Sequence, residues 1–91
     1  MAINNRFQFS ASMATLLCKA AELTLENSEI GFKNLIVRID YCDYRDKMSV
    51  INYLGISPIT WTYFSALPPS TAFKHRVANI ILEWLRDEYL F

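Results

Sequence analysis

The side chains that could do chemistry are few, and none belongs to a recognisable catalytic or metal-binding pattern. His75 is the only histidine, and nothing in the sequence arranges a nucleophile and a base around it. Cys18 and Cys42 lie far apart, without the close spacing of zinc ligands or of a disulfide framework. We therefore expect a protein that is not an enzyme and that holds no metal or cofactor.

Three carboxylates spaced by three residues, Asp40, Asp43 and Asp46, are the remaining candidates for a cation site. They lack the glycine and the terminal glutamate of a calcium-binding loop. The chain has only two glycines, which leaves no glycine-rich loop to cradle a phosphate. Helix capping and solvation explain the three carboxylates better.

Composition and charge indicate one small domain, with residues 1–9 as a short N-terminal arm. The chain has 91 residues, 53% of them hydrophobic, which suits a single core. Nine basic and nine acidic side chains cancel, so the positive charge typical of a non-specific nucleic-acid binder is missing. No signal peptide or membrane-spanning run is visible, and both cysteines should be reduced. We expect a soluble cytoplasmic protein without a membrane partner.

Apolar residues recur at helical spacing through the first half of the chain. A first helix is predicted from Ser10 or Ser12, as its N-cap, to about Glu26. A second is predicted after Ser28, with a core face formed by Phe32, Leu35, Ile36 and Ile39. Residues 35–41 are rich in β-branched side chains and could instead form a strand. We favour the helix because a lone strand would have no partner.

Capping signals divide the next segment into two short helices. The third helix should start near Asp43 or Asp46 and end at Gly55, which occupies the position of a left-handed residue after a helix. Residues 57–58, Ser-Pro, are typical of the N-cap and first turn of a fourth helix. That helix should reach Leu67, where a Pro-Pro pair stops it.

The strongest helical repeat comes last. Ser70 or Thr71 should cap this fifth helix, and its apolar residues follow at intervals of one, three and four: Phe73, Val77, Ile80, Ile81, Trp84 and Leu85. The predicted fold class is therefore all-α, a compact bundle of about five helices.

The turn Leu54-Gly55-Ile56-Ser57, followed after eleven residues by Pro-Ser, carries a family resemblance. Together with its flanking helices, over residues 46–85, it resembles the helix-turn-helix of the phage-repressor (Xre-like) family. The resemblance implies that Gly55 makes the turn, that Val50, Leu54 and Ile56 pack inside the corner, and that Trp61 and Phe64 face the core. Ile51 and Trp61 depart from the family, which has smaller residues at both places.

The resemblance implies a small DNA-binding transcription regulator. The exposed face of the fourth helix would then contact the bases through Pro58, Ile59, Thr62 and Tyr63. None of these is an arginine, lysine, asparagine or glutamine, the side chains that make the strong base contacts. Phosphate contacts would come from basic residues on either side of that helix: Arg45, Lys47, Lys74 and Arg76.

A protein partner is the alternative, because an apolar exposed helix also suits a partner's groove. An antiactivator, an immunity protein or another inhibitor would fit this description. In either case a homodimer is expected, formed by an apolar C-terminal surface: Trp84, Leu85, Tyr89, Leu90 and Phe91.

Overall fold

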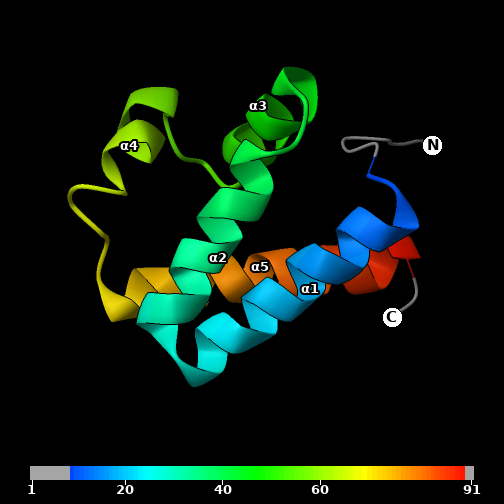
Figure 1. Cartoon of the computed structure of the whole chain (residues 1–91), viewed down its shortest axis with the longest axis horizontal. Helices are drawn as coiled ribbons and strands as arrows, with labels where there is room; N and C mark the ends of the chain where they lie inside the picture. Colours follow the sequence, from blue (N-terminus) through cyan, green and yellow to red (C-terminus); the bar gives the residue numbers. More distant parts are fainter. Residues whose placement is uncertain (1–8, 90–91) are drawn as a thin grey trace.

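The computed structural model describes residues 9–89, which form an all-α bundle (Figure 1). Its five helices are α1 (Ala11–Glu26), α2 (Ser28–Asp40), α3 (Tyr44–Tyr53), α4 (Pro58–Tyr63) and α5 (Thr71–Tyr89). No strand occurs within residues 9–89, so the predicted fold class is confirmed and residues 35–40 are helical. Of the predicted arm, only Phe9 lies within the described residues.

Side-chain caps start the helices as the sequence indicates, with one exception. Ser10, Asp43 and Ser57 accept the N–H groups that open α1, α3 and α4. At α2, however, the side chain of Asn27 accepts the N–H of Ile30, and Ser28 is already helical. The prediction of Ser28 as the cap is wrong because Asn27, in an extended conformation, both ends α1 and starts α2.

The fourth helix is shorter than predicted. It ends at Tyr63, and a series of turns continues to Leu67. The Phe64 N–H bonds the Trp61 carbonyl, three residues back, which already tightens the last turn. Pro68 and Pro69 offer no N–H donors that could extend the helix.

Helices α1 and α2 cross with their backbones in contact. A Cβ atom on Gly31 would overlap the backbone of Thr24, so only glycine fits at the crossing. The facing side chains of α1 are small and buried, among them Ala20 and Ala21. In Figure 1 α5 lies behind α1 and α2, and it closes the core with Val77, Ile81 and Leu85.

The two ends of the described chain meet at one end of the molecule. The Tyr89 hydroxyl donates to the Phe9 carbonyl at 2.9 Å, and the rings of Phe9 and Trp84 pack edge to face at 5.7 Å. Trp84 is 6% exposed and Leu85 is fully buried. The prediction that Trp84 and Leu85 form a dimer surface is therefore wrong, because this domain uses both for its own core. The predicted contacts of Leu90 and Phe91 lie outside the described residues.

Within the described residues, no helix combines the length and the hydrophobicity that crossing a membrane requires.

The Gly31 crossing makes a testable prediction. Gly31→Ala should lower the free energy of unfolding by about 3 kcal/mol or more, since a methyl group would force two backbones apart. Gly55→Ala is the control: its φ is +75° with open space around it, so the cost should be only about 1 kcal/mol. Urea unfolding followed by circular dichroism measures both, and equal losses would contradict the close crossing.

Candidate functional site

The corner between α3 and α4 is built on a glycine turn. Gly55 adopts a φ of +75°, as predicted for the residue after a helix. Its N–H donates to the Asn52 carbonyl at 3.0 Å, and the Ile56 N–H donates to the Ile51 carbonyl at 3.1 Å. These two bonds satisfy carbonyls at the end of α3 and direct the chain into α4.

The inner side of the corner is apolar, as the sequence indicates. Val50 and Ile56 are buried and Leu54 is partly buried. Trp61 and Phe64 face inward and are 4% and 7% exposed, which confirms their predicted core role.

Aromatic side chains connect α4 to the rest of the bundle. The Phe64 ring packs against Trp61, against Phe32 of α2 and against Phe73 of α5, each with ring centroids 5.9 Å apart. Large rings thus span the space between α4 and the core. The bulky Trp61, which departs from the resembled family, is one of them.

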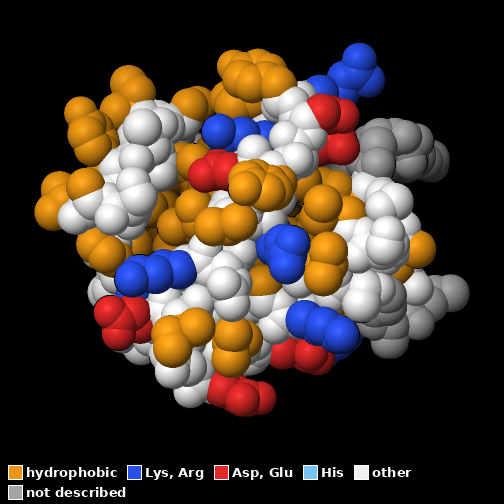
Figure 2. Space-filling model, in the orientation of Figure 1, with side chains coloured by type: hydrophobic (Ala, Val, Ile, Leu, Met, Phe, Trp, Pro, Cys, Tyr) orange, Lys and Arg blue, Asp and Glu red, His pale blue; other side chains and the backbone are white. Residues whose placement is uncertain are grey.

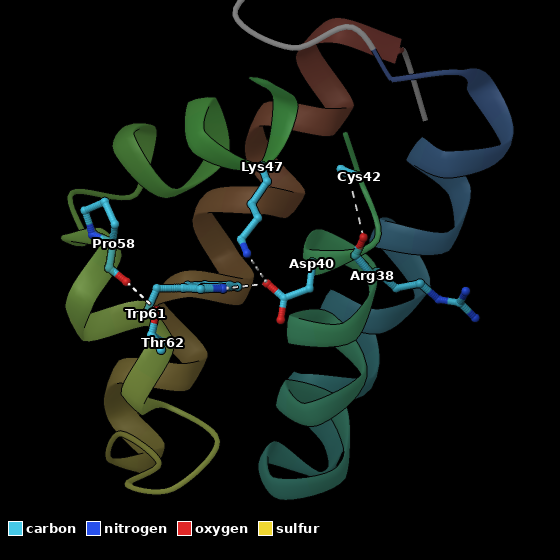
Figure 3. Close-up of polar contacts among 7 residues, drawn as sticks. All are labelled: Arg38, Asp40, Cys42, Lys47, Pro58, Trp61 and Thr62. Atoms are coloured by element: carbon cyan, nitrogen blue, oxygen red, sulfur yellow. Dashed lines mark hydrogen bonds and ion pairs between the residues drawn. The ribbon is translucent and has the colours of Figure 1, made fainter. Parts of the chain in front are cut away.

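A polar network of three side chains joins α2, α3 and α4 (Figure 3). The Trp61 indole Nε1 donates to Asp40 Oδ1 at 2.8 Å, and Lys47 Nζ lies 3.3 Å from the same oxygen. A buried indole N–H needs an acceptor, and Asp40 supplies it from the end of α2. The sequence does not predict this pair. A buried indole N–H is expected to need an acceptor, but Asp40 lies 21 residues from Trp61 and no local pattern links the two.

The outer side of α4 is exposed and apolar. The predicted contact residues Pro58, Ile59, Thr62 and Tyr63 are all exposed. The Thr62 hydroxyl donates to the Pro58 carbonyl at 2.9 Å and so has its hydrogen satisfied within the helix.

Three large apolar side chains, spaced by four residues, form what we call the α4 ridge: Ile59, Tyr63 and Leu67. They are 70%, 58% and 73% exposed. The Leu67 N–H donates to the Tyr63 carbonyl at 2.7 Å, so the turn places Leu67 one helical turn beyond Tyr63. No charged residue occurs from 48 to 73. Figure 2 shows hydrophobic side chains gathered over α4 and the loop that follows it.

The four basic residues predicted to contact phosphate differ in their surroundings. Arg45 and Arg76 are exposed, while Lys47 is half-buried and pairs with Asp40. Lys74 is only 8% exposed, with its ammonium 6.0 Å from the Phe32 ring centroid. The prediction of Lys74 as a surface phosphate contact is therefore wrong, because α5 turns this residue toward α2.

The aspartates and cysteines that the sequence offers as candidates for chemistry have roles in capping or packing. Asp43 caps α3, and Asp46 is buried in its first turn. Burial, followed by the negative charges of Asp46, Asp43 and Asp40, raises the pKa of Cys42 from 9.0 to about 11. Burial also raises the pKa of Cys18. Within residues 9–89, no group of three or more His, Cys, Asp or Glu side chains could hold a metal ion.

Comparisons with protein-family models, with curated proteins and with solved structures found no match. The α3–α4 corner and its exposed face are the features of the molecule that bear on its function.

The bond between Asp40 and Trp61 should contribute measurably to stability. A double-mutant cycle with Asp40→Ala and Trp61→Phe should give a coupling energy of about 1 kcal/mol, because Asp40→Ala leaves a buried indole N–H without its acceptor. Lys47→Met, which removes only the partly exposed ion pair, should cost less than about 1 kcal/mol. Additive losses in chemical denaturation would contradict the coupling.

The raised pKa of Cys42 predicts a slow thiol. In a Cys18→Ser background, iodoacetamide should alkylate Cys42 at pH 8 about 100-fold more slowly than an ordinary cysteine, with a rate that climbs until about pH 11. Asp46→Asn should shift this profile to lower pH.

The free energy of unfolding should fall between about pH 9 and 11, because the Cys42 thiol ionises at a lower pH in the unfolded chain than in the folded one. A midpoint at or below 9 would contradict the assignment.

Proposed function

We propose that this chain is a protein-interaction module that binds its partner through the α4 ridge. The observation that carries the proposal is the exposure of Ile59, Tyr63 and Leu67 on an uncharged segment. Aromatic side chains are enriched and charged ones depleted in the cores of protein interfaces. A folded domain gains nothing from presenting three such side chains to water.

The inner side of α4, which supports the ridge, also favours binding of a partner. Trp61 is fixed by Asp40 on the inner side of α4, and Phe64 is fixed by three aromatic contacts. The backbone that carries the ridge is therefore anchored before binding, which lowers the entropic cost of association. Side chains four residues apart insert into an apolar groove as anchors of a helix-in-groove complex. The partner should supply such a groove.

DNA binding is the second candidate, favoured by the glycine corner and by the outward position of α4. The predicted basic residues would attract DNA phosphates less strongly than the sequence alone indicates. Asp40 neutralises Lys47, and Lys74 is withdrawn into the fold, which leaves Arg45 and Arg76 as exposed anchors among the four predicted. Phosphate contacts supply most of the affinity of DNA-binding proteins, so this loss counts against DNA.

The ridge can be tested with a photoreactive amino acid. Placed at residue 59, it should crosslink one protein in an extract of the source cells, which mass spectrometry identifies. Tyr63→Ala should then weaken binding of the purified partner at least tenfold, as expected for an aromatic anchor. Tyr41→Ala is the matched control, since Tyr41 is 78% exposed outside the ridge, and it should leave the affinity unchanged.

The two candidate functions respond differently to charge. Reversal of Arg45 and Arg76 to glutamate should leave the partner affinity within about twofold, because both side chains are exposed and neither belongs to the ridge. Fluorescence anisotropy with duplex DNA at low salt provides the opposite readout. Three results together would overturn our proposal in favour of DNA. The native chain would bind DNA, the charge reversals would abolish that binding, and Tyr63→Ala would not change the affinity for the crosslinked protein.

A further inference from the structure

A cleft of about 640 Å³ lies beside α4, between α2, the start of α5 and the loop that joins α4 to α5. Phe32, Ile36 and Val37 of α2 form one apolar wall, and Phe64 and Pro68 contribute to the other. Its size is within the range of small-molecule sites, which are mostly apolar and carry a few polar groups that orient the ligand.

The polar group that stands out in this cleft is Lys74. It lines the cleft although the residue is only 8% exposed, and its ammonium lies over the Phe32 ring at 6.0 Å from the centroid. Within residues 9–89 no ion pair or hydrogen bond involves its side chain, and every Asp and Glu of the chain falls in that range. Glu29 lines the same cleft but makes no ion pair with it.

The Lys74 side chain is packed within the fold, and no described side chain pairs with its ammonium. An anion in the cleft would supply the missing counter-ion and form a charge-assisted hydrogen bond with Nζ. Two helix N-termini add to the attraction: α2 and α5 begin at Ser28 and Thr71, and both residues line the cleft.

We propose that this cleft binds a small amphiphilic carboxylate. The carboxylate pairs with Lys74 Nζ, and the apolar body lies against Phe32, Phe64 and the wall formed by α2. Lys33 and Glu29 also line the cleft, but Lys33 is exposed, so Lys74 is the cation set among the apolar walls. One such cation matches one negative group on an apolar molecule. This site is separate from the α4 ridge, and the inference does not depend on the proposed protein partner.

Decanoate is the probe, with decanol as the uncharged molecule of the same chain length. Titration calorimetry should detect decanoate binding to the native chain, at least tenfold tighter than decanol. Heteronuclear NMR shifts should map to the cleft, at Phe32, Val37 and Lys74, and not to the α4 ridge.

Lys74→Met should weaken decanoate binding at least tenfold, since it removes the cation but keeps the length of the side chain. It should leave the melting temperature of the free protein near that of the native chain, which shows that the variant folds. Lys19→Met, an exposed change of the same net charge on α1, is the matched control and should alter neither quantity.

Three outcomes would overturn the proposal. These are the absence of decanoate binding at millimolar concentration, equal affinity for decanol or for the Lys74→Met variant, and shifts confined to the α4 ridge. If an acidic peptide shifts the cleft resonances and decanoate does not, the occupant is a protein segment and the ligand class proposed here is wrong.

Discussion

The backbone contact between α1 and α2 at Gly31 is the constraint on which the rest of the fold depends. It brings the two helices so close that small residues, Ala20, Ala21 and Thr24, form the α1 side of the interface. The pair then presents a continuous apolar surface on which α5 packs. A domain of this size buries a limited share of its surface, so one tight crossing has a large effect on whether it folds.

Against this three-helix base, α4 is held by side chains and by a tight turn. Gly55 sets its direction, Asp40 holds the Trp61 indole, and Phe64 reaches the rings of α2 and α5. The inner side of α4 packs against the bundle. The outer side is exposed and does not contribute to the core, so its apolar side chains are candidates for binding another molecule.

Local signals predicted the elements well because their causes are local. Ser10, Asp43, Ser57 and Gly55 act through the backbone within five residues, and each lies where the sequence places it. Two errors are local and small: the cap of α2 and the length of α4. The others concern long-range packing, because the partner of Trp61, the burial of Lys74 and the place of Trp84 in the core all depend on how distant helices meet. Apolar periodicity identifies a face of α5 but not whether that face meets this chain or another one.

The bond from the Tyr89 hydroxyl to the Phe9 carbonyl has a practical consequence for the molecule as a component of larger assemblies. It joins the two ends of the described chain at the side of the bundle away from α4 (Figure 1). A domain fused at either end, or a short peptide that connects both ends into a circle, would leave the α4 side unobstructed. The fold therefore separates the place where it can be tethered from the surface it offers to other molecules.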